Sequence, residues 1–232
     1  MCGRYTLTNP DPARLRARFD ILESADEALP AEPRYNIAPT DPVPAIRRRA
    51  EGRELGRLRW GLLPGVWATK KGQRPLINAR AESVATQAAF AESFRERRCL
   101  MPADGFYEWL SDERGKRPVW FHRPDGELFA FAGIWAELER RGSDEVLHSC
   151  ALITCAPNQL MRPVHDRMPV VLEPGAEAAW LDPDRKPEEL LELLVPASED
   201  ALTYREVGDL VNDVREDGPE LIEPREEQSA LF

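Results

Sequence analysis

The 232-residue sequence has no apolar run close to the roughly 20 residues that a helix needs to span a bilayer. Its beginning, MCGRYTLTNPD, turns polar early and has no apolar stretch of the kind found in secretory signals. Internal repeats, low-complexity tracts and flexible linkers are also missing. These absences predict a cytoplasmic protein without membrane contact, associated with the nucleoid if the host is prokaryotic.

Cysteine is scarce, and its four copies, Cys2, Cys99, Cys150 and Cys155, form no C-x-x-C pair. We therefore expect neither disulfides nor a cysteine-based redox motif. His148, Cys150 and Cys155 follow a spacing that matches none of the usual zinc sites, so we expect no metal and no organic cofactor. The better interpretation of LHSCALITC is a buried strand whose small thiols pack as apolar groups.

Positive charge is in deficit, with 31 basic and 41 acidic residues and a formal net charge of −10. This balance argues against nonspecific coating of duplex nucleic acid. It does not exclude a local nucleic-acid site, because phosphate binding needs a basic patch rather than a basic total. The composition is otherwise that of an ordinary globular domain, with 42% apolar residues.

Secondary-structure signals favour a strand-rich protein. A helix is predicted over Asp11–Phe19, where Asp11 can cap and a proline follows, and another around Glu82–Glu96. Two strands are expected around a turn at residues 51–52. Short strand-like runs with hairpin turn signals follow, namely FYEWL, RPVWFH, ELFAFAGIWAEL and VLHSCALITC, and then two short helices, PGAEAAWLD and KPEELLELLVP. We predict a single α+β domain over residues 1–224, with a mostly antiparallel, barrel-like sheet and short peripheral helices, and a frayed tail at residues 225–232.

Cys2 becomes the N-terminal residue if Met1 is removed, which a small second side chain permits. Its α-amine would then have a pKa of about 7.7–8.0 beside a thiol of about 8.5, so both groups are partly reactive near neutral pH. The amine can form an imine with an aldehyde, and the thiolate can close that imine to a five-membered thiazolidine. The alternative is that Cys2 is only a small residue that allows Met1 to be removed.

Three further segments carry polar side chains suited to chemistry. In INARAES, an extended backbone would place Asn78 and Arg80 on one face, where they could hold a sugar phosphate, although a turn Asn beside a surface Arg is common. In ADGFYEWL, Glu108 has aromatic neighbours; burial would suit it to proton transfer, and exposure on an edge strand is the alternative. In PVHDRMPVVL, His165 and Arg167 share a face of a predicted loop, whereas His122 and His148 lie in strand-like runs.

The order of these and other motifs is specific. MCGRY, YNIAPT, WGLLPGVW, INARAE, CLMPADGFYEW, FAGIW, LITCAPN and HDRMPVVL follow one another from Cys2, and a closing VNDVREDGPELIEP segment ends at Pro224. The sequence resembles the SRAP family, named for SOS-response-associated peptidase. The resemblance implies a single, mostly β domain with a positively charged channel for single-stranded DNA.

The resemblance also implies roles for individual residues. Four residues match the family's catalytic group. Cys2 matches the residue that bonds to the ring-opened abasic sugar, and Asn78 matches the one that positions the amine and sugar. Glu108 matches the residue that transfers protons, and His165 matches the one that assists sugar opening and adduct reversal. Those matching DNA-contact positions are the phosphate-binding Arg4 and Arg80 and the site-lining Asn36, Pro39, Trp67 and Trp109. Arg167 is added to the DNA groove as a further expectation.

The sequence therefore predicts covalent capture of abasic sites in single-stranded DNA by a monomer. Strand nicking through the imine, a lyase activity, is expected as a side reaction, and Met1 is removed either by the protein itself or by an aminopeptidase. One alternative is a cysteine peptidase or autopeptidase, with Cys2 as nucleophile, His165 as base and Asn78 or Asp166 as orienting group. The other is a noncatalytic module that binds single-stranded DNA.

Overall fold

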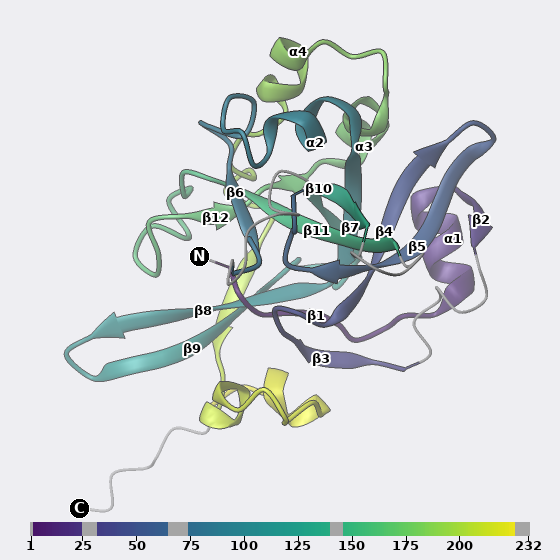
Figure 1. Ribbon diagram of the computed structural model, residues 1–232. Coiled ribbons are helices and arrows are strands. Elements are labelled where there is room, and N and C mark those ends of the chain that lie inside the picture. Colours follow the sequence, from purple (N-terminus) through teal and green to yellow (C-terminus); the bar gives the residue numbers. More distant parts are fainter. Residues whose placement is uncertain (1, 25–31, 65–73, 140–145, 226–232) are drawn as a thin grey trace, which may run out of the picture.

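A computed structural model describes residues 2–24, 32–64, 74–139 and 146–225, and within them the strands form two sheets (Figure 1). The smaller sheet is antiparallel throughout and positions the N-terminal segment between its neighbours. Its strand order is β14 (Thr203–Glu206), β9 (Gly115–His122), β8 (Gly105–Asp112), β1 (Tyr5–Leu7) and β3 (Arg34–Ile37).

The larger sheet closes on itself. Its main path is β12 (Met168–Pro169), β11 (Val146–Cys155), β10 (Phe129–Glu139), β7 (Arg98–Ala103), β4 (Pro42–Arg49), β5 (Gly52–Trp60) and β2 (Ile21–Ser24), with β13 (Val171–Leu172) on β10 and β6 (Asn78–Arg80) on β11. A parallel pairing of Cys150 with Trp60 joins β11 back to β5. Because β5, β4, β7, β10 and β11 then form a closed ring, this part of the sheet is a barrel. The predicted α+β class with a mostly antiparallel, barrel-like sheet is confirmed.

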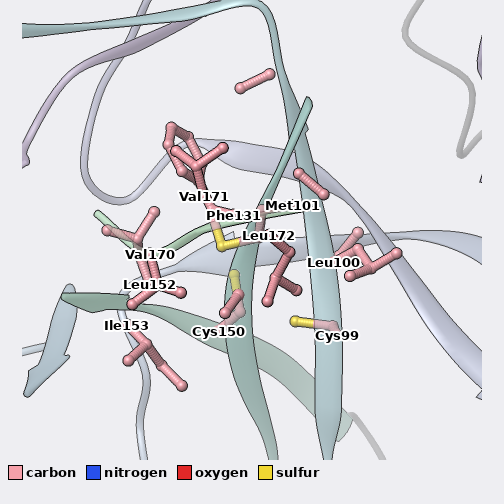
Figure 2. Packing of buried hydrophobic residues seen from close by; sticks show 14 of the residues in the cluster. Cys99, Leu100, Met101, Phe131, Cys150, Leu152, Ile153, Val170, Val171 and Leu172 are labelled. Carbon is pink, nitrogen blue, oxygen red and sulfur yellow. The ribbon is translucent and has the colours of Figure 1, made fainter. Parts of the chain in front are cut away.

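The barrel interior is a close-packed apolar core. Cys99, Met101, Phe131, Cys150 and Leu152 lie in one cluster contributed by β7, β10 and β11 (Figure 2). All of these side chains are fully buried, so the expectation that the thiols of this region pack as apolar groups is confirmed. Within the described residues, no group of histidine, cysteine and acidic side chains is arranged to hold a metal ion.

Short helices cover the outside of the sheets. They are α1 (Pro12–Phe19), α2 (Ala91–Glu96), α3 (Pro174–Leu181), α4 (Pro187–Glu192) and the 3-10 helices η3 (Asp209–Asn212) and η4 (Pro219–Ile222). The helix α1 begins as predicted, because the Asp11 carboxylate accepts a 2.7 Å hydrogen bond from the backbone of Arg14. The segment with η3 and η4, yellow in Figure 1, contacts β9 and β3. No helix in the described ranges is long and apolar enough to cross a membrane.

The prediction of a helix over Glu82–Glu96 is wrong for its first half. Residues 81–90 form successive hydrogen-bonded turns, and only Ala91–Glu96 is helical. The backbone of Ala81 donates to the Thr154 carbonyl of β11, which holds the start of this segment against the sheet. Val84 and Phe90 are buried in the core, so packing against the barrel outweighs the local helix propensity of the segment.

Candidate active site

The N-terminal segment that leads into β1 carries Cys2 into a buried position. Only 1% of Cys2 is exposed, and its thiol donates a long contact of 3.7 Å to the Arg4 carbonyl. Figure 1 shows this end of the chain beside β6 and β8. Burial raises the pKa of the Cys2 thiol, and the nearby Glu108 carboxyl raises it further. The thiol is therefore protonated in this environment.

Asn78 begins β6 and faces the same segment. The register of β6 beside β11 pairs Asn78 with Leu152, and the side-chain amide of Asn78 donates a 2.9 Å hydrogen bond to the Cys2 carbonyl. The other end of the amide, Oδ1, is buried and accepts no hydrogen bond in the described part of the chain. An unsatisfied buried acceptor costs about 1–3 kcal/mol, so a group kept in that state is a candidate for binding a ligand.

Glu108 lies in the middle of the smaller sheet, since β8 pairs with both β1 and β9. It is 3% exposed, which answers the question that the sequence left open between burial and an exposed edge. Burial raises the pKa of the Glu108 carboxyl. A carboxyl with a raised pKa beside a thiol is suited to moving protons near neutral pH.

His165 lies in the loop between β11 and β12, which Asn158 and backbone turns hold in place. The Asn158 side chain accepts from the Met161 backbone at 2.9 Å and donates to the Ala197 carbonyl at 3.1 Å. The backbone N–H of His165 in turn donates to the Met161 carbonyl at 3.0 Å. The ring is thus carried by a loop with its own buried anchor, and the prediction that His165 lies in a loop is confirmed.

The Nδ1 atom of His165 has two neighbours that require different protonation states. The backbone N–H of Arg167 lies 2.9 Å away and needs an unprotonated Nδ1, whereas Asp166 Oδ1, also at 2.9 Å, needs a protonated one. The Asp166 side chain is 85% exposed and free to turn into water, while the backbone N–H is fixed. We therefore assign the tautomer of the neutral form of His165 as the one that carries its proton on Nε2.

The two arginines expected beside this group differ in their partners. Arg80, at the end of β6, is exposed, and its side chain makes no hydrogen bond or ion pair with another described residue, although its charge helps to lower the pKa of Glu82. Arg167 is engaged: its guanidinium donates two hydrogen bonds to the Glu82 carboxylate, at 2.7 and 2.8 Å, and one to the Thr154 carbonyl at 2.6 Å. Arg80 is thus available to a phosphate, whereas Arg167 would have to leave Glu82 to reach one.

A second group of predicted DNA contacts lies against the C-terminal segment. Arg4 donates to Asn36 Oδ1 at 2.8 Å and to the Val211 carbonyl at 2.7 Å, and the Asn36 amide donates to the Asp213 and Glu216 carbonyls. These contacts fix the chain around η3 to β1 and β3. The roles of Arg4 and Asn36 toward DNA stay predictions.

The remaining predicted DNA contacts are dispersed. The indole of Trp109 donates to Asn212 at 2.8 Å, and Lys116 lies 5.7 Å from the center of its ring. These three residues line an open hollow of about 440 Å³. Pro39 is half-buried after β3, and Trp67 lies outside the described residues.

The structure thus brings together Cys2, Asn78, Glu108 and His165 from four separate segments, with Arg80 at the end of β6. Sequence reasoning missed Glu82 and Lys116. Glu82 follows Arg80 by two residues in INARAES, so the same alternation argument that joined Asn78 to Arg80 could have drawn attention to it. Nothing in the sequence pairs Lys116 with Trp109 except their positions in a hairpin.

Comparisons with known proteins identify the family and the fold of this chain. A family model described as SOS response associated peptidase (SRAP) matches residues 1–214. The chain is 38% identical to the abasic site processing protein YoqW of Bacillus subtilis, over 96% of this chain and 99% of that protein, and 32% identical to the abasic site processing protein YedK of Escherichia coli, over 97% and 100%. Its fold matches a crystal structure of a protein from Bacteroides thetaiotaomicron with a TM-score of 0.86 at 21% identity, covering 97% of this chain and 100% of that one.

Proposed function

The chain belongs to the SOS response associated peptidase (SRAP) family, and from that premise we propose that it captures abasic sites in single-stranded DNA through Cys2. The observation that carries the proposal is the surroundings of Cys2. The side-chain amide of half-buried Asn78 holds its backbone carbonyl, and a buried carboxyl, Glu108, lies close enough to raise the pKa of its thiol. An internal cysteine would present only a thiol, whereas Cys2 without Met1 presents a thiol and an amine on adjacent carbons.

The proposed reaction has two bond-forming steps. The neutral Cys2 amine attacks the aldehyde carbon of the opened abasic sugar, and loss of one water gives an imine. The sulfur then adds to the imine carbon while the thiol proton goes to nitrogen, which closes the thiazolidine. Glu108, whose burial keeps its pKa high, takes and returns protons between these steps.

Asn78 and His165 act on the sugar in this proposal. The Asn78 Oδ1 is buried and has no partner among the described residues, so it can accept a hydrogen bond from the freed amine or a sugar hydroxyl, which places the nucleophile before it reacts. His165, assigned with its proton on Nε2, can exchange protons with the sugar during ring opening and reversal. At the imine stage, β-elimination would transfer a proton from the sugar carbon next to the imine carbon to a base and expel the 3′ phosphate, which nicks the strand and gives the lyase side activity.

DNA is held by a small number of cations and aromatic faces. Arg80 is exposed, and its side chain has no hydrogen bond or ion pair among the described residues, so it is the first candidate for a phosphate next to the lesion. The hollow at Trp109 and Lys116 offers a ring beside a positive charge, where a flanking base can stack with about 1–3 kcal/mol per base. Such contacts do not read sequence, which suits a lesion that has lost its base. We propose that one copy of the chain suffices.

The peptidase alternative uses the same residues differently. A cysteine peptidase needs a thiolate, yet burial and Glu108 both disfavour the charged form of Cys2. This favours the capture reaction, in which the amine attacks first and the thiol reacts second.

The proposal is tested with single-stranded DNA bearing one abasic site, separated on a denaturing gel. The wild-type protein should give a heat-stable shifted band. Cys2→Ala should lose the band and keep noncovalent binding, and Cys2→Ser, which keeps the amine, should nick the strand without a stable adduct. A band that persists in Cys2→Ala contradicts the proposal, and unchanged DNA binding with no band from any protein indicates a binding module.

A further inference from the structure

Arg167 is the most heavily bonded cation near the candidate site. Its guanidinium meets the Glu82 carboxylate through two parallel hydrogen bonds of 2.7 and 2.8 Å, and it is only 11% exposed. Such fork-to-fork pairs fix orientation as well as charge. The pair also lowers the pKa of Glu82, so this carboxyl is ionised at neutral pH.

The same guanidinium joins two parts of the site. Its third hydrogen bond ends on the Thr154 carbonyl, which also accepts from the Ala81 backbone. Thr154 pairs with Arg80 in the β6–β11 register, two residues beyond Asn78. Arg167 therefore ties the loop that carries His165 to the strand that carries Asn78.

The backbone of Arg167 sets the state of the neighbouring ring. Its N–H donates to His165 Nδ1 at 2.9 Å, which leaves the neutral ring protonated on Nε2. This contact depends on where residue 167 is held, and its side chain is held by Glu82 and Thr154. Arg167 Nε is buried without a hydrogen-bond partner, and among the described residues Glu82 is the one side chain that accepts from this guanidinium.

We infer that Glu82 is a positioning residue: through Arg167 it fixes the tautomer and placement of His165 against the strand of Asn78. The inference rests on the proposed function only for the part that His165 plays in the reaction. Glu82 touches neither Cys2 nor the sugar in this account, and its side chain, 56% exposed, has no role in the core. Removing it should release the Arg167 side chain and, with it, the loop.

The first test is the ¹⁵N spectrum of the histidine rings, which reports the tautomer directly and needs no substrate. The chain has three histidines, so His122→Gln, His148→Gln and His165→Gln assign the signals. Wild-type His165 should show a neutral ring protonated on Nε2. Glu82→Ala should move both ring nitrogens toward the average of two tautomers, and Glu82→Gln, which keeps one acceptor, should move them less.

A matched control separates positioning from the general loss of an ion pair. Glu92 on α2 is 60% exposed and accepts a 2.7 Å hydrogen bond from Arg97, whose described contacts do not include His165. Glu92→Ala should leave the His165 signals unchanged. The inference is overturned if Glu82→Ala also leaves them unchanged, or if Glu92→Ala moves them equally.

The second test is the crosslinking rate under single-turnover conditions. Outer-shell partners that orient metal-bound histidines are typically worth about 10- to 100-fold, and by analogy Glu82→Ala should slow the wild-type rate by about that factor and Glu82→Gln by less. An unchanged rate in Glu82→Ala overturns the link to catalysis. If the histidine spectra change as expected but the wild-type protein forms no crosslink, the positioning by Glu82 holds and the proposed function fails.

Discussion

The side-chain amide of Asn78 donates a 2.9 Å hydrogen bond to the backbone carbonyl of Cys2, which joins residues 76 positions apart in the chain. This contact anchors the N-terminal segment to β6, and β6 is itself anchored to β11 through its parallel register. One end of the amide is used in that way, while Oδ1 is buried and accepts no hydrogen bond from any described residue. Asn78 therefore both places Cys2 and offers it a free acceptor.

Substitution of Asn78 should impair the reaction without abolishing DNA binding. Asn78→Ala removes both ends of the amide, and Asn78→Asp keeps an acceptor but removes the N–H that holds Cys2. Misplacing a reacting group by about 1 Å can cost about 100-fold, so both variants should crosslink on the order of 100-fold more slowly. Single-turnover gels measure the rate, and fluorescence anisotropy with intact single-stranded DNA checks binding. A wild-type rate in Asn78→Asp contradicts the anchoring role.

The raised pKa of Glu108 predicts the pH dependence of stability. A carboxyl whose pKa is higher in the folded than in the unfolded protein contributes stability that is full below its ordinary value of 4.5 and is lost as pH rises through the folded pKa. The wild-type protein should therefore lose stability relative to Glu108→Gln as pH rises from about 4.5. Urea unfolding at a series of pH values measures the difference.

Asp125 provides a control of opposite sign. Its hydrogen bond from Arg123 lowers its pKa to about 2, so its contribution is present above the ordinary value of 3.8 and is lost as pH falls toward 2. Asp125→Asn should remove this loss of stability at acid pH and leave the pH dependence of stability above pH 5 unchanged. A Glu108→Gln profile parallel to the wild type would show that the folded carboxyl is not perturbed.

Arg80 should contribute to noncovalent affinity through phosphate. Arg80→Ala is expected to weaken binding of single-stranded DNA of any sequence and to reduce the slope of log affinity against log salt by about 0.7, the value for one phosphate contact on a single strand. Arg114, 70% exposed near the tip of the β8–β9 hairpin, supplies the matched control, and Arg114→Ala should change neither quantity. Equal effects of the two substitutions would indicate that DNA affinity depends on the net charge of the protein rather than on a phosphate contact at Arg80.

Gly105, where β8 begins, allows close approach of the Trp120 indole, with which a Cβ atom would overlap. Gly105→Ala should destabilise the protein by about 1–3 kcal/mol, since the ring is packed and must shift. Gly175 in α3 faces open space, and Gly175→Ala should be neutral or stabilise by about 0.5–1 kcal/mol. Thermal unfolding distinguishes them, and equal stability of the two variants would contradict the tight packing of β8.

The sequence predicted the parts of the fold and site that depend on local pattern. Alternation along INARAES is reflected in half-buried Asn78, buried Ala79 and exposed Arg80, and the predicted capped helix at α1 is present. The strand hairpin around residues 51–52 is likewise confirmed by the register of β4 with β5.

Contacts between distant segments could not be predicted in the same way. Glu82 and Arg167 are 85 positions apart, and Arg4 reaches the Val211 carbonyl across 207 positions. No periodicity encodes such pairs, because they arise only when the barrel closes and brings the loops to one side. The incorrect helix at residues 82–90 has the same origin, since the core position of Val84 is set by the sheet.

The most direct test of the central claim is mass spectrometry of the protein–DNA adduct after digestion of both partners. We predict an N-terminal peptide that begins at Cys2, lacks Met1 and carries the abasic sugar with the loss of one water. Because a thiazolidine uses both groups of Cys2, neither its amine nor its sulfur should react with labelling reagents. A sugar found on another residue, or on a Cys2 whose thiol still reacts, would contradict the account.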